Sequence, residues 1–226
     1  MDVRELRPGL WRWTLPHPEW TPEEAGEAGW EENVASYFIE APGGPVLFDP
    51  LAPLRSPERA RFWTALDRDV ERHGPPAVLI TVFFHARSAQ AILDRYGGAT
   101  VWGHEPAAAR IGERVRLTNS FRPGEPLPGG AEALPTIRGG EVLFWLPEHR
   151  ALVAGDVLLG TPEGGIRVCP DSWLPAGIDG NALRSSLSPL LERRVELVLL
   201  THGEPVLTGA GAALARTLEP HSPPSA

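Results

Sequence analysis

Residues 77–87 read AVLITVFFHAR, an apolar run that ends at Thr81 and is followed closely by His85. Unbroken apolar runs are typical of strands that are buried on both faces of an α/β sheet. The carboxyl ends of such strands are where these sheets gather their ligands. The sequence therefore predicts a buried strand here, with His85 beside a site at its carboxyl end.

Three other short apolar runs end in the same way, at side chains that can take part in chemistry. They are residues 46–48 before Asp49, residues 151–154 before Gly155-Asp156, and residues 198–200 before Thr201-His202. Because strands of one α/β sheet present their carboxyl ends at a common edge, two aspartates and two histidines are predicted to share one site. The pattern does not name a substrate.

The rest of the chain alternates between strand and helix patterns. One helix is predicted to begin at Ser56-Pro57-Glu58, with serine as its N-cap, proline in its first turn and an acid at its positive end. Other helices are expected near residues 88–96, 105–113, 183–191 (bent at Pro189) and 209–218. Further strands are expected over residues 10–14, 34–40, 100–103, 141–146 and 195–200.

In each half of the chain the strands come first and the helices follow. This order predicts an α/β (α+β) architecture in which two sheets pack face to face with helices outside. We expect one domain over residues 1–220, with halves that meet near residues 122–130, and a disordered tail at residues 221–226.

The net charge of the chain limits the classes of partner that it is expected to bind. The 226 residues carry a formal net charge of −8, and the basic residues are scattered rather than clustered. We therefore expect no nucleic-acid partner and no membrane, but a small-molecule ligand or substrate. No apolar run approaches the ~18 residues of a membrane span, and the first residues lack the apolar core of a signal peptide. These features predict a cytoplasmic protein.

Two absences exclude whole classes of chemistry. All 21 basic residues are arginine, so Schiff-base enzymes, pyridoxal phosphate enzymes and Walker-A loops, which need a lysine, are excluded. Cys169 is the only cysteine, which excludes intrachain disulfides and cysteine-cluster zinc sites.

Taken in order, the strand ends resemble those of the metallo-β-lactamase superfamily. Four pieces carry the resemblance: Phe48-Asp49-Pro50, Leu79-Ile80-Thr81, the segment from Glu141 to Gly155-Asp156, and Thr201-His202-Gly203. The resemblance implies a four-layer αββα sandwich with the site at one edge of the sheets.

The metal motif departs from that family. The superfamily places Thr-His-x-His-x-Asp-His at the first strand end, where this chain has TVFFHAR at residues 81–87. In an ungapped alignment His85 falls on a spacer, and the four ligand positions hold Val82, Phe84, Ala86 and Arg87. The histidine expected before Glu141 is also replaced, by the segment Thr136-Ile137-Arg138. Of the family's ligands only Asp156 and His202 persist, so the ordinary two-zinc centre is not expected.

The remaining residues are still sufficient for a site that holds one metal ion. Asp156 and His202 supply two ligands, and His85 supplies a third if a one-residue bulge turns it inward, which is the minimum for an open zinc site. Iron or manganese fit the same set. The alternative is that no ion binds, that Asp156 hydrogen-bonds turn amides, and that His202 packs against it. The cofactor is therefore one zinc, iron or manganese ion, or none.

The same residues also predict a metal-free site. His202 held by Asp156 is a candidate general base, and Arg87 is a candidate for stabilising an anion. Equally, Arg87 is a helix-start residue that pairs with Asp49 or Asp156.

Three residues are second-rank members of the predicted pocket. Asp49 matches the family's aspartate that steadies the metal loop, although capping of the turn at Pro50 is the interpretation we favour. His17 lies between two prolines, on a loop whose counterpart often borders the active site in the family. Asp171 either reaches the same edge or makes a local turn beside Trp173.

Four of the eight tryptophans lie in the first thirty residues, namely Trp11, Trp13, Trp20 and Trp30. These tryptophans are expected to wall an aromatic pocket, to cover a sheet or to form a homodimer face, and the sequence does not favour one of the three.

The predicted site and the fold resemblance together indicate a divergent hydrolase of a small ester, lactone or amide. The rival hypothesis is a non-catalytic binding or scaffold protein that kept the fold and lost the metal centre.

Overall fold

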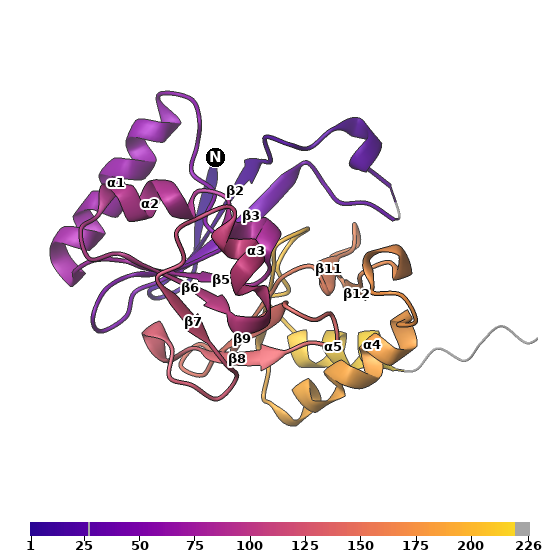
Figure 1. Cartoon of the computed structure of the whole chain (residues 1–226). Helices are drawn as coiled ribbons and strands as arrows, with labels where there is room; N and C mark the ends of the chain where they lie inside the picture. The colour runs from indigo at the N-terminus through magenta and orange to yellow at the C-terminus, as the bar shows by residue number, and fades with distance from the viewer. Residues whose placement is uncertain (27, 220–226) are drawn as a thin grey trace, which may run out of the picture.

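Two β-sheets lie face to face, and helices cover the outer side of each in the computed structural model (Figure 1). The structure describes residues 1–26 and 28–219. The predicted tail at residues 221–226 lies outside the described residues. Within them, no helix combines the length and the apolar character that crossing a membrane requires.

The first sheet has seven strands in sequence order, β1 to β7. Each strand from β1 to β4 is antiparallel to the next, and each strand from β4 to β7 is parallel to the next. The strands are β1 (Asp2–Arg7), β2 (Leu10–Pro16), β3 (Asn33–Ile39), β4 (Val46–Phe48), β5 (Ala77–Ile80), β6 (Thr100–His104) and β7 (Asn119–Phe121). Parallel neighbours need a crossover, and three helices supply it: α1 (Glu58–His73), α2 (Ala89–Arg95) and α3 (Ala108–Gly112).

The second sheet is smaller and contains one parallel pair. Its order is β13 (Leu197–Leu200), β10 (Ala151–Ala154), β9 (Val142–Leu146) and β8 (Glu132–Pro135). Beside it lies a hairpin of β11 (Leu158–Gly160) and β12 (Ile166–Val168). Helices α4 (Gly180–Leu187) and α5 (Ala210–Leu218) pack on its outer face, and residues 122–130 carry the chain from one sheet to the other.

Three apolar layers hold the sandwich together. The central layer joins the sheets, and there Phe48 of β4 packs against Phe144 of β9, with ring centroids 5.6 Å apart. The outer layers seat α1 to α3 on the first sheet and α4 and α5 on the second. The predicted strands carry unbroken apolar runs because each sheet has a covered face on both sides. The four-layer αββα arrangement is confirmed.

Several predicted elements differ from the observed ones, and the short strands β7, β8, β11 and β12 were not predicted. Ser56 makes no capping hydrogen bond, because α1 begins at Glu58 with Pro57 as its N-cap. The helix expected near residues 183–191 ends at Leu187 and continues as a 3-10 turn, η6 (Ser188–Glu192), that contains Pro189. Strand β1 was not predicted, because as an exposed edge strand it has no apolar face.

Hydrogen bonds between the two sheets bring the strand ends to one edge. The Val142 N–H donates to the Thr81 carbonyl at 3.0 Å, just beyond β5. The Ala35 N–H of β3 donates to the Thr201 carbonyl at 2.8 Å, just beyond β13. The ends of β5 and β13, which come from different sheets, are thereby fixed beside one another.

Candidate functional site

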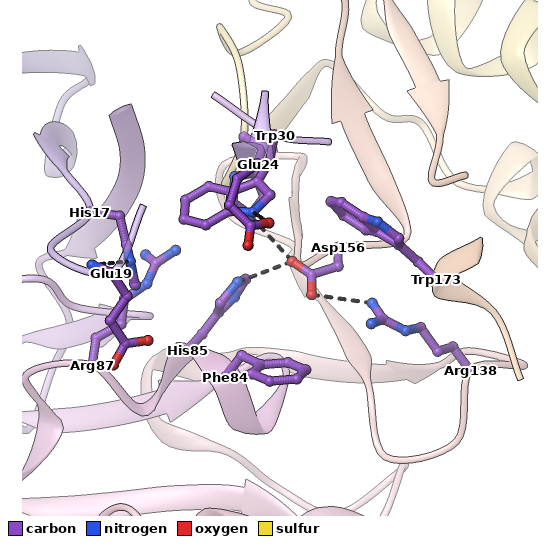
Figure 2. A pocket seen from close by; sticks show the side chains of 11 residues that line it. His17, Glu19, Glu24, Trp30, Phe84, His85, Arg87, Arg138, Asp156 and Trp173 are labelled. Atoms are coloured by element: carbon purple, nitrogen blue, oxygen red, sulfur yellow. Dashed lines mark hydrogen bonds and ion pairs between the residues drawn. The ribbon is translucent and has the colours of Figure 1, made fainter. Parts of the chain in front are cut away.

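A cavity of about 350 Å³ opens at this edge of the sandwich (Figure 2). Its floor contains His85, Asp156 and His202, and its walls include Trp30 and Trp173. The other lining residues are His17, Glu19, Glu24, Phe84, Arg87 and Arg138. Most of these side chains come from segments far apart in the sequence, so the cavity exists only in the folded chain.

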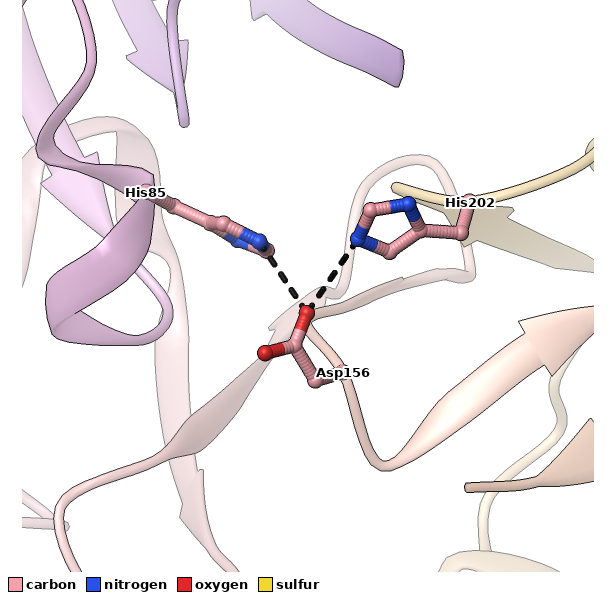
Figure 3. A group of neighbouring side chains, drawn as sticks. All are labelled: His85, Asp156 and His202. Carbon is pink, nitrogen blue, oxygen red and sulfur yellow. Dashed lines mark ion pairs between the residues drawn. The ribbon is translucent and has the colours of Figure 1, made fainter. Parts of the chain in front are cut away.

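Three buried side chains converge on one point of the floor (Figure 3). Nε2 of His85 lies 3.0 Å from Oδ1 of Asp156, and Nε2 of His202 lies 3.3 Å from the same oxygen. One ligand atom from each of the three residues lies within 4.8 Å of the other two. The structure thus brings together the three residues that were predicted to form a metal site.

A tight turn, rather than a bulge in the strand, directs His85 inward. After β5 the chain forms a 3-10 turn, η2 (Phe83–Ala86), in which the His85 N–H donates to the Val82 carbonyl at 2.8 Å. The turn buries His85 and leaves Phe84, at a family ligand position, 46% exposed. Arg87 ends the turn with φ of 35°, a left-handed conformation that non-glycine residues seldom adopt. The predicted one-residue bulge has been replaced by this turn, with the same result for His85.

Asp49 holds the imidazole of His85 from behind. Its Oδ2 lies 3.0 Å from Nδ1 of His85 and accepts a hydrogen bond of 2.6 Å from the Thr81 hydroxyl. Its Oδ1 accepts from the Thr81 N–H at 2.9 Å. The interpretation that Asp49 only caps the turn at Pro50 is therefore wrong. A carboxylate in this place fixes the ring so that Nε2 faces the cavity, as outer carboxylates do for metal-binding histidines.

The surroundings of the Oδ1 atom of Asp156 show whether the three residues fit a metal ion. It is buried and has no hydrogen-bond partner of acceptable geometry among the described residues, although two imidazole nitrogens lie beside it. Ligand atoms that share a tetrahedral ion at ~2.0–2.1 Å are about 3.3 Å apart. The two N–O separations are close to that value, so the donor set fits one divalent ion and leaves room for a further ligand.

The charges of the cluster are strongly coupled. Burial opposes the protonation of His85, but Asp156 and Asp49 outweigh it and raise the pKa of His85 to about 9. Burial likewise opposes ionisation of Asp156, yet His85 and His202 hold the pKa of this carboxyl well below its usual range. Burial lowers the pKa of His202. Without a metal ion, a charged His85 therefore lies between two carboxylates.

This charge pattern predicts how the stability of the metal-free protein depends on pH. The ordinary pKa of a histidine is 6.5, and that of His85 in the folded protein is about 9. The stabilisation from charged His85 is therefore complete below pH 6.5 and is lost as the pH rises through 9. We expect the free energy of unfolding to fall by about 2 kcal/mol from pH 7 to pH 9. Urea denaturation of chelator-treated protein measures it. The His85→Gln variant should lose most of this slope, and an equal slope in both proteins would contradict the assignment.

Arg138 lines the cavity and pairs with the buried Glu141, and neither was predicted as a site residue. Nη1 of Arg138 donates to Oδ2 of Asp156 at 3.2 Å and to Oε2 of Glu141 at 2.9 Å. Burial and the nearby Asp156 raise the pKa of Glu141 to about 7. The available signal was that Arg138 lies in the segment where the family's histidine is expected. Since the guanidinium occupies one oxygen of Asp156, the other oxygen remains for a single ion.

Arg87 lines the cavity but does not form the predicted carboxylate pair. Its Nη1 donates to the backbone carbonyls of Ala35 and Asp49, both at 3.0 Å. No ion pair joins it to a described carboxylate. Its first role is therefore to connect β3 with the end of β4, while its charge remains beside the cavity.

The two remaining predicted residues lie in different places. His17 lines the cavity, and its ring meets the edge of Trp30 at a centroid distance of 5.2 Å. Asp171 does not line it. Its Oδ1 accepts a hydrogen bond of 2.8 Å from the Gly180 N–H, so it connects residues 171–173 to the start of α4 instead.

The N-terminal tryptophans have separate roles. Trp30 covers the His202 ring, with centroids 5.1 Å apart, and its indole N–H donates to Oε2 of Glu24 at 3.1 Å. Trp13 belongs to the core and donates to the Leu51 carbonyl at 2.7 Å. Only Trp30 of the four therefore lines the central cavity.

Comparison with solved structures shows the fold of the chain. No protein-family model and no curated protein matches the sequence. A metallo-β-lactamase from Pontibacter korlensis matches with a TM-score of 0.67 and 14% identity, over 96% of this chain and 98% of that one. A metallo-β-lactamase family protein from Thermus thermophilus matches with a TM-score of 0.63 and 19% identity, over 94% of this chain and 79% of that one. A metallo-β-lactamase from Hirschia baltica matches with a TM-score of 0.63 and 13% identity, over 98% of this chain and 99% of that one.

At these identities the likeness shows the fold alone. It confirms the metallo-β-lactamase-like sandwich that the sequence resemblance implied, in a strongly divergent chain. The function of the site depends on its own residues, because one fold serves many functions.

Proposed function

We propose that this metallo-β-lactamase-fold chain hydrolyses a small ester, lactone or amide, with one divalent metal ion held by His85, Asp156 and His202. The observation that carries the proposal is the buried Oδ1 atom of Asp156. Two imidazole nitrogens lie beside it at 3.0 and 3.3 Å without a well-formed hydrogen bond. Zinc, iron and manganese all accept two histidines and a carboxylate.

The ion would polarise the substrate carbonyl and lower the pKa of a water molecule. The protein's own residues prepare the site for it. Asp49 fixes the His85 ring from behind, and Arg138 neutralises the second oxygen of Asp156. Trp30 and Trp173 wall the cavity and reduce its contact with bulk water, which strengthens electrostatic interactions inside it.

His17 is suited to stabilising negative charge on the substrate. Burial, with Arg87 next, lowers its pKa to about 4, so its ring is neutral near pH 7. Nδ1 accepts a hydrogen bond of 3.3 Å from the Glu19 N–H, which places the ring proton on Nε2. From there it is available as a hydrogen-bond donor to a developing oxyanion.

A metal-free binding protein is the second candidate, and two observations favour it. Nδ1 of His202 has no hydrogen-bond partner among the described residues, whereas metal-binding imidazoles usually have one. Charged His85 and Arg138 also give each of the buried carboxylates Asp49, Asp156 and Glu141 an ion-pair partner without a metal ion.

The deciding experiment combines metal analysis with turnover. Purified protein supplied with zinc, iron(II) or manganese is expected to hold one ion per chain and to hydrolyse at least one member of an ester, lactone and amide panel. His202→Ala should lose the ion, and its kcat/KM should fall at least about 100-fold. His73→Ala, at the exposed end of α1, is the matched control and should keep both properties. Absence of turnover with all three metals in folded protein would leave only the binding function.

A further inference from the structure

A second cavity adjoins the central one beside the η2 turn. Its volume is about 320 Å³, and it shares Phe84, Arg138 and Trp173 with the central cavity. Phe83 and Arg110 line it as well. The two cavities therefore border on the same three side chains, one of which is Phe84.

Two arginines and two phenylalanines form an unusual group at this point. The guanidinium carbon of Arg110 lies 3.3 Å from the ring centroid of Phe83 and 5.8 Å from that of Phe84. That of Arg114 lies 5.6 and 5.5 Å from the same two rings. The two rings lie against one another, with centroids 3.8 Å apart. Among the described residues, Phe84 is the only exposed aromatic side chain.

Neither guanidinium has an anionic partner. Each of the two side chains is exposed, and no described carboxylate lies within ion-pair distance of either. Their four-residue spacing places two like charges on the same two rings, a repulsive arrangement that an anion would relieve. Planar guanidinium groups are well suited to carboxylate and phosphate oxygens.

We propose that Arg110, Arg114 and the Phe84 ring form a subsite for an organic oxyanion, a carboxylate or phosphate attached to an apolar body. The inference deepens the proposed function and rests on it, because it defines the substrate class as esters, lactones or amides that carry such a group. The oxyanion would contact the two guanidinium groups, and the apolar body would lie on Phe84 and lead to the central cavity. Arg138, shared by both cavities, is already paired with Asp156 and Glu141, so the positive charge available to the oxyanion is that of Arg110 and Arg114.

Binding of unreactive probes tests the subsite without requiring catalysis. Titration calorimetry would compare phenylacetate, phenyl phosphate and the neutral isostere phenylacetamide on the purified protein. At least one anion should bind about tenfold more tightly than phenylacetamide, and the better anion identifies the oxyanion. The Arg110→Ala/Arg114→Ala double variant should lose this advantage, and the Arg110→Lys/Arg114→Lys variant should keep part of it. Arg116→Ala, an exposed arginine on the same segment, should bind as the wild type does.

The outcomes separate this subsite from the metal site. Phenylacetate or phenyl phosphate binding that survives His202→Ala but not the double arginine variant supports the subsite, even if no ester is ever hydrolysed. Binding that is lost with His202→Ala and unchanged in the double variant places the anion at the metal and overturns the proposal. Equal binding of anions and phenylacetamide overturns it as well.

If turnover is found, paired esters test the substrate class directly. An aryl ester with a six-carbon acyl chain ending in a carboxylate should have a kcat/KM about tenfold above that of its methyl-ended counterpart. The double arginine variant should abolish this preference, because the kcat/KM of the carboxylate-ended ester should fall about tenfold. A preference that persists in the double variant would contradict the subsite while leaving the hydrolase proposal intact.

Discussion

Replacing Asp156 with asparagine is expected to lower the affinity for a divalent ion by more than about 100-fold, beyond the loss that an outer hydrogen-bond partner causes. The change is nearly isosteric, but it removes the negative charge toward which both imidazoles point. Asparagine can still accept the hydrogen bond from Arg138, so the floor of the cavity keeps its shape. Metal titration followed by elemental analysis measures the effect, and hydrolysis should fall to the background rate.

Asp94→Asn provides the matched control for Asp156→Asn. Asp94 is exposed on α2 and accepts a hydrogen bond of 2.7 Å from the Gln90 amide. The same chemical change there should leave metal content and turnover unaltered. If Asp156→Asn binds the ion as tightly as the control does, the ion is not held by the cluster on the cavity floor.

Replacing Asp49 with alanine is expected to lower the free energy of unfolding by about 3–5 kcal/mol, because it leaves a buried charge and its hydrogen-bond donors without a partner. Asp49 is 1% exposed and meets Nδ1 of His85 as well as both donors of Thr81. Urea denaturation at pH 7, where His85 is charged in the metal-free protein, measures the loss. Metal affinity should also fall about 10- to 100-fold as the ring of His85 becomes free to turn.

An aspartate with a purely local role supplies the comparison. Asp179 is the N-cap of α4, and its Oδ1 accepts a hydrogen bond of 2.8 Å from the Ala182 N–H. Its replacement by alanine should cost about 1 kcal/mol, as the loss of a helix cap does. If Asp49→Ala costs no more than Asp179→Ala, Asp49 acts only on its own turn.

Much of the scaffold was predictable because burial leaves a local pattern. Strands such as β5 and β10 are covered on both faces, so each reads as an unbroken apolar run in the sequence. The exposed edge strand β1 and the three-residue strands β7, β11 and β12 carry too little pattern to be recognised. The false cap at Ser56 shows that capping chemistry alone does not decide where a helix begins.

The site was predictable in its membership but not in its arrangement. Asp156 and His202 each lie two residues beyond the end of a strand, so their places followed from the strand ends. His85 depended on a turn whose geometry an ungapped alignment could not provide, and Asp49 was assigned the wrong contact. Arg138 was noticed only as a replaced histidine. Its ion pairs with Glu141 and Asp156 bring together two segments of the second sheet.

The amino-acid sequence was enough to predict the sandwich, to exclude lysine chemistry and to name the polar groups at the strand ends. Those properties follow from the composition and from the order of apolar runs along the chain, and both can be read from residues that are neighbours in the sequence. Tertiary structure alone decided that Asp49 supports His85, that Arg138 occupies one oxygen of Asp156, and that two arginines share the Phe84 ring. These contacts depend on left-handed turns and on residues far apart in the chain, and no local pattern encodes the direction in which such a side chain points.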